Sequence, residues 1–357
     1  MSDVREQQQT AVRKDVAEHL VELSPGGETF TARQDESVLD AALRQGISLK
    51  YGCRHGNCST CKYLIEDGDV DLGDASAYSL PDEEREEGWA LLCCATALSP
   101  LVIRDNREVD DRAMPFIAPS EQVGHVVSIV ELTPELSELT VKVDMPLKFY
   151  PGQFAELGIA GHGGTLWRSY SMASPPSRSH ELQFVIKRIK GGAFSGKLDT
   201  LSEGSPIQVR GPFGSSYLRE GDRAVLLCAI GSGLAPILSM LRDAAERRDP
   251  RAFHLFYGAR RPADVPYYEE IAEGMNRALG GRLRFTPTLD GLTAEDHWSG
   301  ERGTVTQTIQ RKLEGAQGVD AYLCGAPAMC ETVARLLAAK GLPESQLFFD
   351  QFFPAAT

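Results

Sequence analysis

The first third of the chain alternates short apolar and polar stretches in a way that predicts a small domain of strands around one helix. Turns that contain Gly and Pro separate these stretches, and the helical one ends at a glycine. Two strands, the helix and two further strands are expected at residues 16–23, 28–31, 37–46, 62–66 and 101–104. This order is typical of a β-grasp domain over residues 15–109, which follows a disordered lead at residues 1–14.

The middle third contains more alternating stretches, and its turns follow one another closely. Its expected strands lie at residues 124–130, 139–143, 154–157, 182–186 and 207–209. Many short strands at such spacing predict an antiparallel β-barrel, here over residues 121–220. Residues 110–120 mix charges with two prolines and show no sustained periodicity, so they are interpreted as a linker.

The last third begins with an almost continuous apolar run at residues 224–229, which is typical of a strand buried on both faces of a parallel sheet. A glycine-rich turn, a helical stretch at 237–247 and a second apolar strand at 253–257 complete a βαβ unit. Later strands and helices are expected at residues 282–286, 306–314, 321–324 and 329–340. The fold class is therefore multidomain α+β, and its last part is an α/β domain with a parallel sheet over residues 221–357.

Four cysteines have a spacing that indicates a metal centre, namely Cys53, Cys58, Cys61 and the more distant Cys93. The pattern C-x4-C-x2-C followed by a remote fourth cysteine is that of plant-type 2Fe-2S ferredoxins. Zinc is the rival metal, but zinc sites usually pair two loops of two cysteines each. Cys94 could replace Cys93 as the fourth ligand, and the sequence alone leaves that choice open.

The cysteines and the charges limit which cellular compartment and which classes of partner are expected. Eight cysteines, of which four are claimed by a metal, favour a reducing compartment, so we expect a cytoplasmic protein. No apolar run approaches the roughly 20 residues that cross a bilayer, so no membrane partner is expected. The net charge is -13, and residues 1–110 hold 22 Asp and Glu against 11 Lys and Arg, which argues against nucleic-acid binding. The acidic stretch 82–87 either keeps the domain soluble or steers it onto a basic partner.

Two motifs in the middle third suit a flavin dinucleotide. In the first motif, Arg168 offers a fork of donors for a pyrophosphate, Tyr170 a flat face for a ring, and Ser171 a hydroxyl for a ring nitrogen. Alone, this motif would rather be an edge strand with an exposed arginine. The second motif, Gly191-Gly192 followed by Ser195, supplies free N–H groups for phosphate. As a pair the two motifs favour a flavin site.

The last third carries a glycine-rich turn between the apolar strand and its helix, with Gly231, Gly233 and Pro236. Such a turn lets a helix N-terminus face a phosphate, although a tight turn without any ligand remains the alternative. Cys324 ends another expected strand, so its thiol is expected at the carboxyl edge of the sheet, where open α/β sheets bind ligands.

Taken together, these motifs resemble a plant-type ferredoxin fused to the flavin and pyridine-nucleotide domains of the ferredoxin-NADP reductase superfamily. The ferredoxin-first order and the residues Leu91-Leu92-Cys93 resemble the reductase components of bacterial soluble di-iron monooxygenases, such as the propane, phenol and methane hydroxylase systems. The reductase of benzoate-type ring-hydroxylating dioxygenases has the same order and is the alternative.

The resemblance implies a role for each motif residue. It places Arg168 on the pyrophosphate of FAD, Tyr170 on the flavin ring and Ser171 near N5, with Ser169 inside the same motif. The remaining residues implied in cofactor binding are Gly191, Gly192 and Ser195 for the FAD pyrophosphate, Gly231, Gly233 and Pro236 for the nicotinamide dinucleotide, Tyr257 and Arg260 near its adenosine ribose, Cys324 and Gly325 beside the nicotinamide, and Phe352 over the flavin. Gln351 replaces the basic residue that usually precedes this phenylalanine.

The implied activity is that of an NADH-dependent reductase. Hydride would pass from NADH to FAD beside the catalytic residues Ser171 and Cys324, and single electrons would then leave through the 2Fe-2S cluster. The implied partner is the hydroxylase component of an oxygenase, docked on the acidic ferredoxin face. NADH is preferred over NADPH, although Arg260 and Arg261 are expected where a 2′-phosphate could bind. A redox-sensing binding module is the alternative from another functional class.

Overall fold

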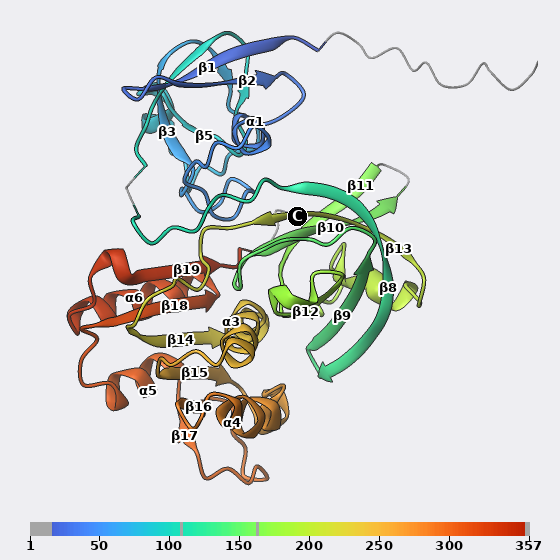
Figure 1. Ribbon diagram of the computed structural model, residues 1–357, viewed down its shortest axis with the longest axis vertical. Helices are drawn as coiled ribbons and strands as arrows, with labels where there is room; N and C mark the ends of the chain where they lie inside the picture. The colour runs from blue at the N-terminus through green and yellow to red at the C-terminus, as the bar shows by residue number, and fades with distance from the viewer. Residues whose placement is uncertain (1–15, 108–109, 162–163, 354–357) are drawn as a thin grey trace, which may run out of the picture. The chain divides into compact units, whose positions relative to one another are not determined.

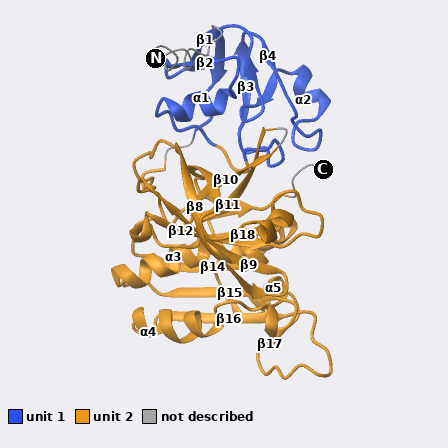
Figure 2. Ribbon diagram, turned by 90° about the vertical axis from the view of Figure 1, so that its right-hand side faces the viewer, with its two compact units in different colours: residues 1–50, 54–107 blue, residues 51–53, 108–357 orange. Residues whose placement is uncertain are grey.

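The computed structural model describes residues 16–107, 110–161 and 164–353. The lead expected at residues 1–14 lies outside these ranges. The chain divides into two compact units, unit 1 with residues 1–50 and 54–107 and unit 2 with residues 51–53 and 108–357 (Figure 2). Within the described ranges, no helix is both long and apolar enough to cross a membrane.

Unit 1 is built on a five-stranded sheet in the order β2-β1-β7-β3-β5. Figure 1 labels its strands β1, β2, β3 and β5 together with helix α1. Its first two strands form the antiparallel hairpin expected around the Pro-Gly-Gly turn, and the last strand, β7, pairs with β1 in parallel. Helix α1 begins at Ser37, whose Oγ accepts a hydrogen bond from the Asp40 N–H at 3.0 Å, an ordinary N-cap. The elements are β1 (Glu18–Ser24), β2 (Glu28–Arg33), α1 (Val38–Arg44), β3 (Lys62–Asp67), β4 (Val70–Asp71), α2 (Asp82–Glu86), β5 (Trp89–Leu91), β6 (Thr96–Ala97) and β7 (Leu101–Arg104).

The first part of unit 2 is an antiparallel sheet in the order β11-β10-β13-β8-β9-β12. A bridge between Met172 and Phe184 links the end of β11 to β12, so the sheet closes into the expected barrel. Its apolar side chains point inward and form a core of their own. The elements are β8 (Ser120–Thr133), β9 (Leu136–Val143), β10 (Phe154–Gly161), β11 (Gly164–Ser171), η1 (Pro176–Arg178), β12 (Glu181–Lys187), η2 (Ser195–Thr200) and β13 (Pro206–Phe213).

The second part of unit 2 is a six-stranded parallel sheet in the order β17-β16-β15-β14-β18-β19. Helix α3 packs on one face of this sheet, and α5 and α6 pack on the other. The elements are β14 (Ala224–Ile230), η3 (Gly231–Gly233), α3 (Leu234–Arg247), β15 (Phe253–Ala259), η4 (Pro262–Asp264), η5 (Glu270–Met275), α4 (Asn276–Ala278), β16 (Leu283–Leu289), β17 (Glu301–Arg302), α5 (Val305–Lys312), β18 (Val319–Gly325), α6 (Pro327–Ala339), η6 (Glu344–Gln346) and β19 (Leu347–Gln351). The fold class expected from the sequence is confirmed.

One hydrophobic core joins the barrel to the parallel sheet. Leu136 and Val185 come from barrel strands, and they lie in the same buried cluster as Leu227 of β14 and Leu234 and Leu238 of α3. Burial of this shared apolar surface opposes separation of the two parts. Residues of the barrel and of the sheet can therefore be held together in one site.

The segment interpreted as a linker makes specific bonds within unit 2. Arg112 donates from Nη1 to Oδ2 of the fully buried Asp320 at 2.7 Å, and Arg219 donates from Nε to Asp110 Oδ2 at 2.9 Å. The Met114 N–H donates to the Tyr217 hydroxyl at 2.9 Å. We call residues 110–115 the strap, because these bonds fasten them to the barrel and to the start of β18.

We expect Arg112→Met to lower the free energy of unfolding of unit 2 by about 3 kcal/mol, because it leaves a buried carboxylate without its hydrogen-bonded cation. Urea denaturation followed by tryptophan fluorescence measures this change. Arg223→Met is the matched control, since Arg223 Nη1 lies 3.6 Å from Asp320 Oδ1, too far for a hydrogen bond. Its cost should stay under about 1 kcal/mol. Equal losses in the two variants would contradict this interpretation of the strap.

Candidate functional site

The cysteine loop at residues 53–61 has the backbone of a ligand loop. Arg54, Gly56 and Ser59 all have positive φ, at 62°, 72° and 57°, and such turns direct successive N–H groups to one side. The Arg54 side chain is buried and donates to Asp40 Oδ1 of α1 at 2.8 Å. The loop is thereby fixed to the first helix of unit 1.

The fourth predicted ligand meets this loop just after β5. A hydrogen bond with the Cys61 thiol raises the pKa of Cys93, and the Gly56 N–H, which also bonds its sulfur, acts in the opposite direction. Neighbouring thiols and an inward N–H suit a cluster whose sulfurs carry negative charge. The chain therefore provides a donor set that fits a 2Fe-2S cluster.

The cysteine spacing favours a 2Fe-2S cluster over zinc, because three of the predicted ligands lie on one loop and the fourth is remote. A structural zinc ion needs four such ligands on one centre, whereas four cysteines are shared between two irons in a 2Fe-2S cluster.

Cys94, the alternative fourth ligand, has different surroundings. Its Sγ lies 3.7 Å from that of Cys93, and a Cβ atom added to Gly56 would come within 2.7 Å of it. The hydrogen bond with Cys93 and burial raise the pKa of Cys94 most, and the nearby negative charge of Asp74 raises it further. A carboxylate opposes the thiolate form that a ligand must adopt. The pKa of Cys93 is raised as well, so Cys93 as the fourth ligand stays a prediction from the spacing.

The predicted flavin motif lies on β11, the first strand in the order of the barrel sheet. Arg168 donates from Nη1 to the Trp167 carbonyl at 2.8 Å, and the Tyr170 ring packs 5.0 Å from that of Phe194. Burial raises the pKa of Tyr170 well above its ordinary value, so its hydroxyl stays protonated at neutral pH. Ser169 is paired in register with Glu156 of β10.

The second flavin motif forms a tight loop that begins the short helix η2. Ser195 Oγ accepts a hydrogen bond from the Ile189 N–H at 3.1 Å. A Cβ atom added to Gly192 would lie 2.4 Å from that oxygen, and Gly191 has φ +73°. The loop therefore requires glycine at both positions, for different reasons. Such a cradle of small residues fits a pyrophosphate group.

The nucleotide turn predicted in the last third follows β14 and approaches β18 closely. A Cβ atom added to Gly233 would lie 2.2 Å from the Cys324 carbonyl oxygen, so the two backbones touch there. Gly231 has φ +53°, and its carbonyl accepts a hydrogen bond from the Tyr257 hydroxyl at 3.2 Å. Pro236 is the third residue of α3, within the first turn as expected. The strand order reverses between β14 and β18, the position at which open α/β sheets bind ligands.

A contact that the sequence did not predict joins the barrel motif to the sheet. The Ser171 hydroxyl donates to Asp350 Oδ2 at 2.9 Å, and the Asp350 N–H bonds the Cys324 sulfur. Residues Ser171 and Cys324, 153 positions apart in the chain, are thereby linked through one residue of β19. By resemblance the sequence placed residues 349–352 near the flavin, but it predicted neither the strand β19 nor the bond to Ser171.

Known protein families match each of the three parts of the chain. The family models that match are a 2Fe-2S iron-sulfur cluster binding domain at residues 21–98, an oxidoreductase FAD-binding domain at 124–217 and an oxidoreductase NAD-binding domain at 226–335. The reductase component DmpP of phenol 2-monooxygenase from Pseudomonas sp. strain CF600 is 36% identical over 343 residues, which cover 94% of this chain and 95% of that protein. The chain belongs to this family of oxygenase reductase components.

Further relatives of the reductase show how wide the family is. The reductase component of propane 2-monooxygenase from Mycolicibacterium smegmatis is 36% identical, over 94% of this chain and 97% of that protein. The electron transfer component of toluate 1,2-dioxygenase from Pseudomonas putida is 33% identical, over 91% and 95%. Among solved structures, the Amycolatopsis cytochrome P450 reductase GcoB has a TM-score of 0.85 and 27% identity, over 95% of this chain and 100% of that one. The reductase is thus an electron-transfer component of a multicomponent oxygenase, with 2Fe-2S, FAD and NAD domains.

FAD supplies the chemistry in such a reductase, since it takes hydride from a nicotinamide and releases electrons singly. The chain's own residues supply position and protonation. Burial, and then the charge of Asp350, raise the pKa of Cys324 well above its ordinary value, so Cys324 Sγ keeps its proton at neutral pH. The Ser171 proton is held by Asp350. Cys324 belongs to the shared core and Ser171 is buried, so water is kept away from both side chains.

Of two further predicted binding residues of the reductase, one lies beside this arrangement and the other does not. The Phe352 N–H donates to the Gly325 carbonyl at 2.8 Å, which places the phenylalanine beside the end of β18. Arg260, by contrast, is not gathered with the other site residues. Its side chain is 77% exposed, and its Nη1 lies 3.8 Å from Glu135 Oε1.

Proposed function

We propose that this reductase takes hydride from NADH onto FAD and passes single electrons through its 2Fe-2S cluster to the hydroxylase of a di-iron monooxygenase. The observation that carries the proposal is the link from Ser171 through Asp350 to Cys324. This link joins the barrel residue predicted at the flavin to the sheet residue predicted at the nicotinamide. The cofactor roles of the motif residues are part of the same proposal.

The choice of a monooxygenase partner is supported by the phenol and propane monooxygenase relatives at 36% identity. A ring-hydroxylating dioxygenase is the second candidate, because the toluate 1,2-dioxygenase component is 33% identical over nearly the same length. The cytoplasm is the proposed location, since four cysteines are proposed as cluster ligands and the eight described cysteines form no disulfide, as in a reducing compartment.

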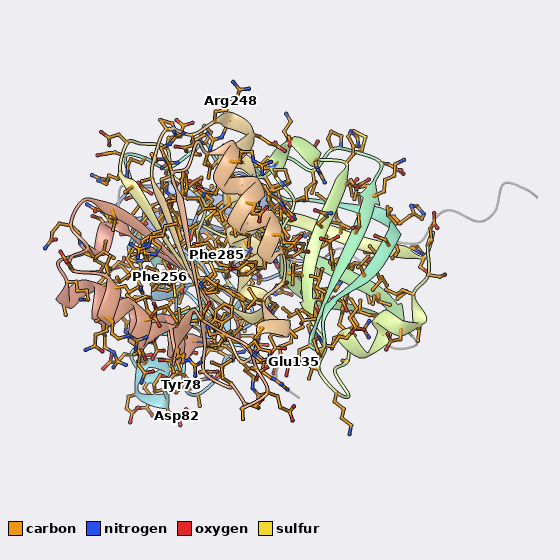
Figure 3. All side chains as sticks on the ribbon, turned by 90° about the horizontal axis from the view of Figure 1, so that it is seen from below. Tyr78, Asp82, Glu135, Arg248, Phe256 and Phe285 are labelled. Atoms are coloured by element: carbon orange, nitrogen blue, oxygen red, sulfur yellow. The ribbon has the colours of Figure 1, made fainter. Side chains whose placement is uncertain are left out.

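For docking, we propose the acidic face around α2 of unit 1. The Asp82 side chain at the start of α2 is 92% exposed and Tyr78 is 85% exposed, whereas Glu84 is ion-paired with Lys62 (Figure 3). An exposed tyrosine near exposed carboxylates suits a contact with a basic surface, because the ring adds apolar contact area and the carboxylates attract positive charge.

The test is anaerobic addition of NADH to protein loaded with FAD and iron-sulfur cluster. Both the flavin and the cluster absorption bands should bleach, and the reduced protein should then drive turnover of a phenol or propane hydroxylase component. If neither absorption band bleached, the proposal that this protein is an NADH-dependent reductase would be wrong. Turnover with a dioxygenase component alone would favour the second candidate.

A further inference from the structure

The residues that follow β15 are basic, which is not what an NADH-dependent enzyme is expected to have there. In dinucleotide-binding sheets, the residue that recognises the adenosine ribose follows the second strand of the βαβ unit, and an acidic side chain there suits the hydroxyls of NADH. Here β15 is followed by two arginines, Arg260 and Arg261, which would suit the 2′-phosphate of NADPH.

The structure brings a carboxylate to these arginines from a distant part of the chain. The loop after β16 runs beside the end of β15, because the Asp290 N–H donates to the Ala259 carbonyl at 3.2 Å and the Gly291 N–H to the Arg260 carbonyl at 2.9 Å. Farther along this loop, Asp296 accepts from Arg261 Nη2 at 3.0 Å and from its Nε at 3.2 Å. The guanidinium is therefore engaged along one whole edge.

Asp296 is held in place by its own loop as well as by the arginine. Its Oδ2 accepts from the Thr293 N–H at 2.8 Å and from Thr293 Oγ1 at 2.9 Å, and its side chain is only 10% exposed. The hydrogen bond with Arg261 and those with Thr293 lower the pKa of Asp296 to about 2. The carboxylate is thus charged and fixed at every pH at which a dehydrogenase is assayed.

We propose that Arg260 and Arg261 form a latent binding site for the 2′-phosphate of NADPH, and that Asp296 closes this site and so sets the preference for NADH. The Arg260 side chain is 77% exposed, and its ion pair with Glu135 is a long one, at 3.8 Å between Nη1 and Oε1. Arg261 is bound to Asp296, whose negative charge also repels a phosphate dianion. The inference rests on the proposed function, because it concerns the same coenzyme site.

The decisive variant is Asp296→Asn, which removes the charge while keeping an oxygen that can accept from Thr293. We expect kcat/KM for NADPH to rise roughly tenfold, as a freed arginine gains a charge-assisted bond to phosphate, while kcat/KM for NADH stays within about twofold. Binding of 2′,5′-ADP, measured by titration calorimetry, should tighten by a similar factor, and binding of 5′-AMP should not change.

Two further variants separate this role from general electrostatics. Glu295→Gln removes the same charge one residue away without releasing Arg261, so NADPH use should change less than about twofold. Adding Arg261→Ala to Asp296→Asn should remove the whole gain. The inference is overturned if folded, FAD-loaded Asp296→Asn gains neither NADPH activity nor 2′,5′-ADP affinity. A wild-type protein that NADH fails to reduce would instead overturn the proposed function.

Discussion

Replacing Cys93 by serine is expected to remove the 2Fe-2S cluster and to lower electron transfer to the oxygenase by at least roughly a hundredfold, while NADH still bleaches the flavin. A serine hydroxyl is a poor iron ligand, because soft thiolates are what hold such clusters. The flavin step is expected to survive, since the residues predicted to carry it belong to unit 2.

Cys94→Ser is the matched control for this variant. It changes the adjacent cysteine, whose sulfur is only 3.7 Å away, and should leave both the cluster and electron transfer intact. Iron and acid-labile sulfide content, at about two of each per chain, together with the low-temperature electron paramagnetic resonance spectrum of the reduced protein, report the cluster directly. Retention of the cluster in Cys93→Ser and its loss in Cys94→Ser would reverse the ligand assignment.

Ser171→Ala is expected to slow the anaerobic bleaching of the flavin by NADH about a hundredfold, a typical cost of removing one positioned hydroxyl from a reaction centre. The hydroxyl donates to Asp350, which in turn bonds the Cys324 sulfur, so the variant breaks this link at the barrel end. Stopped-flow absorbance measures the rate. The FAD content should stay unchanged, because the predicted phosphate-binding residues are untouched.

Ser177→Ala tests whether any hydroxyl between the barrel and the sheet would have the same effect. Ser177 donates to Glu246 Oε2 of α3 at 2.6 Å, so this change also deletes a bond from a serine of the barrel to a carboxylate of the other part. It lies outside the predicted coenzyme motifs and should leave the rate of flavin bleaching as it is. Equal slowing in the two variants would mean that Ser171 serves only to hold the two parts together.

Local patterns were enough to predict the three-part architecture. The alternating barrel strands, the apolar run that became β14 and the cysteine spacing each depend on neighbouring residues, so a single sequence displays them. The motif glycines were also visible, because their constraint is local: Gly191 needs a positive φ, and Gly192 leaves room for Ser195.

What the sequence did not display depends on pairs of distant residues. Asp350 lies in a short apolar strand whose partner, β18, had to be known before the residue could be placed beside Cys324. Asp296 meets Arg261 across 35 positions, and Arg112 meets Asp320 across 208. Such ion pairs have no periodicity, and only the folded chain shows which charges meet.

The strap also bears on how such proteins can be recombined. Although residues 110–115 follow the ferredoxin domain directly, their bonds are made to Asp320, Arg219 and Tyr217 of unit 2. A chimera that receives a foreign ferredoxin would keep these bonds only if its junction precedes Asp110. A junction at the first barrel strand would replace residues 110–115 by a foreign segment, and Asp320 would then lose its bond to Arg112. The boundary that matters for exchanging domains therefore lies some ten residues before the one at which the barrel begins.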